Sequence, residues 1–98
     1  MTKGGYTYLL ASGRNGTLYI GVTSRLDARL FQHHTYSAKS FTGKYQVNQL
    51  VWYEQHDTIE SAIAREKQLK KWNRAWKIAL IEKDNPEWRD LAQELELA

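Results

Sequence analysis

Three stretches of the chain have the apolar patterning of β-strands. Residues 6–11 read Tyr-Thr-Tyr-Leu-Leu-Ala, and residues 17–22 read Thr-Leu-Tyr-Ile-Gly-Val. Asn15-Gly16 lies between them, and this dipeptide is typical of a tight hairpin turn. A third apolar run lies within residues 46–55, and we expect it in the middle of the sheet because such a run needs cover on both faces.

The second strand has two different faces. Successive side chains of a strand point to opposite sides, so Leu18 and Ile20 share one face while Tyr19 and Gly21 share the other. The aliphatic face suits a buried position. The pattern therefore predicts that Tyr19 and Gly21 lie together on the face away from these aliphatic side chains.

The rest of the chain has apolar positions at helical spacing. Ser24 can cap a first helix, Asp57 or Thr58 can open a second, and Asn85 precedes a proline suited to the first position of a helix. The predicted helices span residues 25–34, 59–72 and 75–83. We therefore expect an α+β fold: a small three-stranded antiparallel sheet flanked by helices, in the order β-β-α-β-α-α.

One acidic residue interrupts an apolar stripe. In the helix over residues 59–72 the stripe contains Ala62 and Leu69, and Glu66 falls inside it. A buried carboxylate is unfavourable unless it is paired or binds a metal. Glu66 is thus either a metal ligand or the partner of Arg29 or a lysine at the margin of the stripe.

Composition and charge narrow the class of protein. The 98 residues suit a single domain, with a core at about residues 5–90, and there is no cysteine, which excludes disulfides, thiolate catalysis and the usual structural zinc sites. No run reaches the roughly 20 apolar residues of a membrane span, and the N-terminus lacks a signal-peptide layout, so we expect a cytoplasmic protein without a membrane partner. The net charge is +3, residues 60–80 carry six basic and two acidic side chains, and residues 81–98 form an acidic tail. This distribution favours a polyanionic partner.

Several of these residues occur together in a known family. The order Tyr6-Thr7-Tyr8, Tyr19-Ile20-Gly21, Arg29, His33 and Glu66 resembles the GIY-YIG nucleases, especially their small single-domain bacterial members, over about residues 5–90. The first motif departs from the family pattern because Tyr-Thr-Tyr lacks its Gly and Ile. The resemblance implies cleavage of phosphodiester bonds with one divalent ion, Mg²⁺ or Mn²⁺.

The resemblance also implies roles for individual residues. Tyr19 would activate or orient the attacking water, with Tyr8 in the same pocket, and Gly21 would let the backbone approach the phosphate. Arg29 would stabilise charge on the phosphoryl oxygens, His33 would lie near the nucleophile or leaving group, and Glu66 would hold the metal. These residue types match the demands of phosphodiester hydrolysis, and a single carboxylate with water and phosphate suits Mg²⁺.

Purely structural roles can also explain the same residues. Tyr8 and Tyr19 suit a hairpin core, His34 suits a helix C-terminus, and Asn85 suits a helix cap. Trp72 and Trp76 suit either base stacking or helix packing. The predicted nucleic-acid-binding cations are Lys70, Lys71, Arg74 and Lys77.

The sequence thus predicts a metal-dependent endonuclease acting on DNA, structure- or strand-specific, in repair or recombination. One alternative is a nucleic-acid-binding module without catalytic activity. A protein-interaction domain whose acidic tail docks a partner is a third interpretation, and the intact set of motif residues makes it the least favoured.

Overall fold

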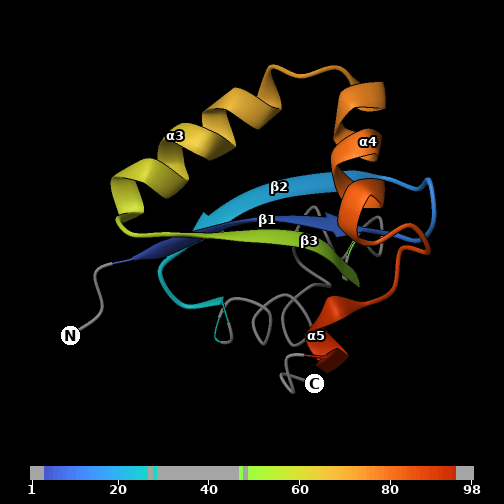
Figure 1. Ribbon diagram of the computed structural model, residues 1–98, viewed down its shortest axis with the longest axis horizontal. Helices are drawn as coiled ribbons and strands as arrows, with labels where there is room; N and C mark the ends of the chain where they lie inside the picture. The colour runs from blue at the N-terminus through green and yellow to red at the C-terminus, as the bar shows by residue number, and fades with distance from the viewer. Residues whose placement is uncertain (1–3, 27, 29–46, 48, 95–98) are drawn as a thin grey trace.

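The computed structural model describes residues 4–26, 28, 47 and 49–94. Its centre is a three-stranded antiparallel sheet of β1 (Gly5–Ala11), β2 (Leu18–Thr23) and β3 (Gln49–His56), in the spatial order β2-β1-β3. Helices α3 (Ile59–Lys70) and α4 (Arg74–Asp84) cover one face, and the short α5 (Leu91–Glu94) lies on the other side (Figure 1). This arrangement confirms the predicted α+β class. No helix in the described ranges is long and apolar enough to cross a membrane.

The β1–β2 hairpin forms where the Asn15-Gly16 signal predicted it. Asn15 has a φ of 57°, a left-handed conformation that asparagine tolerates better than most residues. The register pairs Tyr8 with Gly21 and Leu10 with Tyr19. Two core clusters result: Leu18 and Ile20 pack toward α3 and α4, while Tyr19 packs with the cluster on the opposite face.

The prediction that the third strand occupies the middle of the sheet was wrong. Among the described strands β3 pairs only with β1, so it is an edge strand. Its pairing shifts between Leu9 and Leu10: Trp52 opposes Leu9 and Leu50 opposes Leu10, which leaves Val51 as the extra residue of a bulge. The apolar run of β3 is therefore explained by the bulge and by packing on both faces of the strand, and not by a central place in the sheet.

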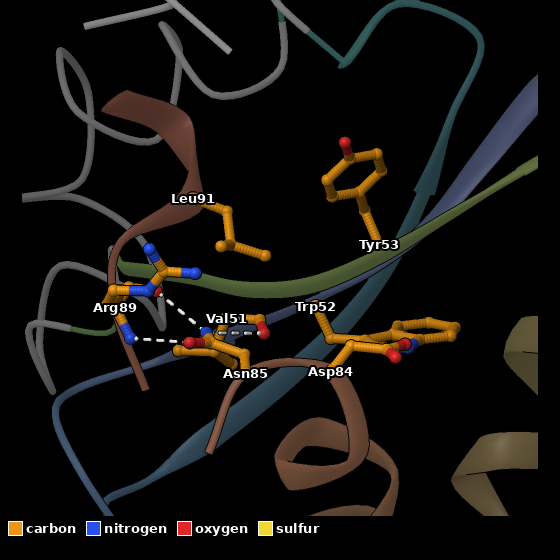
Figure 2. Close-up of a pocket in the computed structure, with 7 residues that line it drawn as sticks. All are labelled: Val51, Trp52, Tyr53, Asp84, Asn85, Arg89 and Leu91. Atoms are coloured by element: carbon orange, nitrogen blue, oxygen red, sulfur yellow. Dashed lines mark hydrogen bonds between the residues drawn. The ribbon is translucent and has the colours of Figure 1, made fainter. Parts of the chain in front are cut away.

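The outer edge of β3 is closed by polar side chains from the C-terminal segment. Asn85 Nδ2 donates a hydrogen bond of 3.1 Å to the Val51 carbonyl, and the Leu50 amide donates one of 3.2 Å to Asp90 Oδ1. Figure 2 shows the Asn85 amide between Val51 and Arg89. An uncovered strand edge invites pairing with other chains, and these bonds occupy it at the bulge.

Helix α3 begins at one of its two predicted caps, and α4 begins at Asn73, a cap that was not predicted. Thr58 Oγ1 accepts from the Ser61 amide at 3.1 Å, and Asn73 Oδ1 accepts from the Trp76 amide at 2.8 Å. Helix α3 is fastened to the sheet by a buried hydrogen bond of 2.8 Å from Thr7 Oγ1 to the Ala62 carbonyl.

The helix predicted to start at Pro86 was wrong. Asn85 instead ends α4, and the Trp88 amide donates to the Asn85 carbonyl at 3.0 Å, which makes residues 85–88 a turn. Proline at the second position of a turn is favoured for the same fixed φ that suits a helix start. The next helix, α5, begins only at Leu91.

Candidate active site

A cleft of about 510 Å³ runs between the edge strand β2 and the two covering helices. Its strand wall consists of residues 18–22. Glu66 and Lys70 of α3 and Lys77 of α4 line the remainder. Figure 1 shows α3 lying over the sheet on the side of β2. The cleft therefore brings the second motif strand and the acidic residue of the helical stripe to one place.

Glu66 faces the hairpin across this cleft. Its side chain is only 16% exposed, and its Oε2 lies 3.0 Å from Lys70 Nζ, one helical turn away. This ion pair with a lysine is one of the two predicted interpretations of Glu66. It is compatible with the other, a metal ligand, because Lys70 is 57% exposed and its long, solvated side chain can turn to another anion.

Tyr19 is part of the strand that lines the cleft, but its ring points to the other face of the sheet. Its residue lines the strand wall, while its ring packs with the core cluster on the face opposite α3. The predicted separation of Tyr19 from Leu18 and Ile20 is thus confirmed. Since β2 pairs only with β1 among the described strands, alternate N–H and C=O groups of its backbone point away from β1. These main-chain groups cannot be recognised from the sequence alone, because their availability depends on the strand order.

Tyr8 and Gly21 interlock instead of jointly lining the cleft. Tyr8 is completely buried and is not among the residues that line it. A methyl group added at Gly21 would overlap the Tyr8 hydroxyl and the ring carbon that carries it. The absence of a side chain at position 21 therefore makes room for the Tyr8 phenol, a reason for this glycine beyond the predicted approach to phosphate.

The four predicted nucleic-acid-binding cations divide between three places. Lys70 and Lys77 line the cleft, and Lys71 lines a separate groove on the outside of α3 and α4. Arg74 Nη2 donates to the carbonyls of Asn15 and Gly16 at 2.7 and 2.6 Å, so it ties the start of α4 to the hairpin turn.

Two predicted catalytic residues, Arg29 and His33, lie outside the described residues, as does His34. Leu26 and Ala28 are helical, at the start of the helix predicted for residues 25–34. Leu26 is buried in the core cluster that contains Tyr8.

Asn85 contacts β3 and the C-terminal segment, and it does not line the cleft. Its Nδ2 donates to the carbonyls of Val51 and Arg89, and its Oδ1 accepts from the Arg89 amide at 3.0 Å (Figure 2). The residue is 1% exposed and lines a small pocket of about 330 Å³ beside β3. These bonds use both of its amide hydrogens, and Asn85 ends α4 instead of capping the start of a helix at Pro86 as predicted.

Within the described part of the chain, no three His, Asp or Glu side chains gather as a metal site. Glu66 is the acidic side chain among the described residues that line the cleft. A divalent ion there would need water and substrate phosphate as further ligands, a mode that Mg²⁺ commonly adopts. The donor set fits a hard ion held by one carboxylate.

Comparisons with known proteins place this geometry in context. The family model described as the GIY-YIG catalytic domain matches residues 4–79. A UPF0213 protein of Syntrophus aciditrophicus is 39% identical over 84 residues, which cover 84% of this chain and 93% of the relative. A UPF0213 protein of Staphylococcus saprophyticus is 30% identical over 76 residues, or 78% and 92% of the two chains.

A solved structure has the same fold. The solution NMR structure of the UPF0213 protein BH0048 from Bacillus halodurans aligns with a TM-score of 0.56 at 22% identity. The alignment covers 92% of this chain and 95% of that one. The shared architecture therefore extends over nearly the whole of both molecules.

Proposed function

Since the chain belongs to the GIY-YIG family, a family of nucleases, we propose that it is a metal-dependent endonuclease that hydrolyses phosphodiester bonds in DNA. The supporting observation is the cleft in which the partly buried Glu66 carboxylate faces the Tyr19–Gly21 segment of β2. The resemblance deduced from the motif residues is confirmed at the level of the family, and the reaction itself is our proposal.

The residues of the cleft divide the chemistry between them. Glu66 would hold the divalent ion, which when bound supplies electrostatic stabilisation to the phosphoryl oxygens. Lys70 and Lys77 would neutralise the incoming phosphate. When phosphate enters, Lys70 would exchange its bond to Glu66 for one to the phosphate, and this exchange would free the carboxylate for the ion.

The other motif residues complete the proposed site. Tyr19 would orient or deprotonate the attacking water at the outer edge of β2, since its ring lies on the sheet face opposite Glu66. Arg29 and His33 would act on the phosphoryl oxygens and on the nucleophile or leaving group. Tyr8 would support the site by holding its strand in place, since its buried phenol lies across Gly21.

The test is cleavage of a panel of flap, nicked, branched and single-stranded DNA with Mg²⁺ or Mn²⁺. We expect Glu66→Gln to abolish cleavage, because the neutral amide removes the carboxylate ligand. Glu60→Gln is the matched control, since Glu60 is an exposed residue in the first turn of the same helix. Equal activity of the Glu66→Gln variant and wild type on every substrate would refute the proposal.

A second function, nucleic-acid binding without cleavage, is favoured by one observation. The Glu66 carboxylate already has a cationic partner at 3.0 Å and needs no metal to be neutralised. In that case Glu66→Gln would leave DNA affinity intact and wild type would cut none of the substrates. The two functions are thus separated by the cleavage assay on wild type, because Glu66→Gln should retain DNA affinity in either case.

A further inference from the structure

A second concave surface lies on the outside of the helical layer. This outer groove, about 510 Å³ in volume, is open and lies between the end of α3 and the start of α4. Its residues are Ala64, Lys67, Gln68, Lys71, Trp72 and Trp76. It contains none of the residues of the catalytic cleft.

The two tryptophans of the groove have different environments. Trp72 is half-buried and packs against the core, and the Arg65 guanidinium lies 5.3 Å from its ring centroid. Trp76 is 57% exposed. The rings meet nearly at right angles, at 88° and 5.9 Å between centroids, so they do not stack on each other. One aromatic face of Trp76 is therefore left for another ring.

The charge around Trp76 complements a phosphate chain. Lys67 and Lys71 are exposed residues of the groove, and among its described lining residues there is no acidic side chain. Exposed aromatic rings beside lysines are the combination that binds single-stranded nucleic acid, because the bases stack while the phosphates are neutralised. A base in a duplex has its faces covered by its neighbours and cannot stack in this way.

The groove and the cleft are adjacent around the α3–α4 corner. Lys70 lines the cleft and Lys71 the groove, while Lys77 lines the cleft and Trp76 the groove. A nucleic-acid strand that leaves the cleft past Lys70 and Lys77 therefore meets Lys71 and Trp76 next.

We propose that the outer groove binds an unpaired nucleotide of single-stranded DNA, with its base stacked on Trp76 and its phosphates beside Lys67 and Lys71. This proposal rests on the proposed function in one respect, because it takes DNA as the partner. It adds a preference for substrates that have an unpaired segment next to the cleaved bond.

The test measures binding apart from cleavage. Glu66→Gln protein, without a divalent ion, is titrated into a fluorescent oligothymidylate and into a duplex of the same length, and anisotropy is recorded. Stacking is worth about 1–3 kcal/mol per base, so Trp76→Ala should weaken single-strand binding about 5- to 150-fold. Trp76→Phe keeps an aromatic face and should retain most of the affinity.

Two controls make the result specific. Lys71→Glu should weaken single-strand binding more than Lys83→Glu, which changes the charge equally at an exposed site on α4 outside the groove. Duplex binding should change less than single-strand binding in Trp76→Ala. Unchanged single-strand affinity in Trp76→Ala, or an equal loss for both DNAs, would overturn the proposal. Absence of cleavage by wild type would count only against the nuclease function.

Discussion

The phenol of Tyr8 fills the space that a side chain at position 21 of the hairpin would occupy. Tyr8 is fully buried in the core cluster that also contains Leu10 and Leu50. A ring in such a position cannot move aside cheaply, because protein interiors are close-packed. The two residues should therefore behave as one unit when either is changed.

We expect Gly21→Ala to lower the free energy of unfolding by about 1–3 kcal/mol, since overpacking a core has that magnitude. Tyr8→Leu removes the obstructing ring, so the double variant should be more stable than the sum of the two single changes predicts by about 1 kcal/mol or more. Urea denaturation of the four proteins measures this coupling. Strict additivity would show that the ring and position 21 do not compete for space.

Glu66 differs from this pair because its side chain supports little of the core. Its one described partner is Lys70, and ion pairs between neighbouring helical turns contribute only a few tenths of a kcal/mol. Glu66→Gln should therefore leave the melting temperature nearly unchanged while it removes cleavage. Thermal unfolding by circular dichroism, run beside the cleavage assay, checks this, and a large loss of stability would point to a structural role.

At the scale of elements, the two edges of the sheet differ in what lies beside them. The edge formed by β3 is closed at its bulge by Asn85 and Asp90, whereas the β2 edge forms the wall of the cleft. The closed edge depends on a single turn, residues 85–88, to position the Asn85 amide. The C-terminal segment thus contributes to the fold by occupying an edge that the sheet leaves open.

We expect Asn85→Asp to lower the free energy of unfolding by about 3 kcal/mol. The change replaces a buried amide that donates to two carbonyls with a carboxylate oxygen that repels them. Asn73→Asp is the control, because at the exposed N-cap of α4 aspartate accepts the same hydrogen bond equally well. Denaturant titration should show a loss in the first variant alone, and equal losses would contradict the buried-bond explanation.

Arg74 connects α4 to the hairpin. Its guanidinium donates to two turn carbonyls, which a lysine ammonium cannot match in geometry. We expect Arg74→Lys to lose about 1 kcal/mol of stability, with faster amide hydrogen exchange at Gly16 and Thr17. DNA affinity should be unchanged because the charge remains. A loss of DNA affinity without a loss of stability would instead support the prediction that Arg74 contacts the nucleic acid.

At the scale of the whole molecule, the cationic residues lie on both sides of the α3–α4 corner. Lys70 and Lys77 face the cleft, and Lys67 and Lys71 face the outer groove. Each phosphate contact made by a lysine adds about 0.7 to the slope of log affinity against log salt for single strands. The slope of log affinity against log salt therefore reports how many lysines contact the phosphates of the bound DNA strand.

We expect the double variant Lys70→Ala, Lys77→Ala to reduce this slope by about 1–2 on single-stranded DNA. Lys83→Ala should leave it unchanged, since this exposed lysine lies at the far end of α4 and lines neither surface. Anisotropy titrations at several salt concentrations provide the slopes. An unaltered slope in the double variant would place the bound DNA elsewhere on the protein.

Much of this molecule was predictable from local sequence pattern. The strands and the Asn15 turn follow from alternation and turn residues, the start of α3 from its cap, and α4 from helical spacing alone. Glu66 interrupts its apolar stripe, which predicted that its side chain faces something other than the core. The bulge at Val51 was not predictable, because it depends on which strand is central and on helices that pack over both faces. Pro86 was ambiguous because one φ serves both turns and helix starts.

The interlock of Tyr8 with Gly21 has an evolutionary consequence. A homologue without the proposed nuclease activity would still be under selection to keep Tyr8 and Gly21, since replacing either residue would loosen the hairpin. The signature that gives the family its name therefore diagnoses architecture in a distant homologue. Position 66, where we expect substitution to change stability little, is the better place to look for relatives that lack the proposed activity.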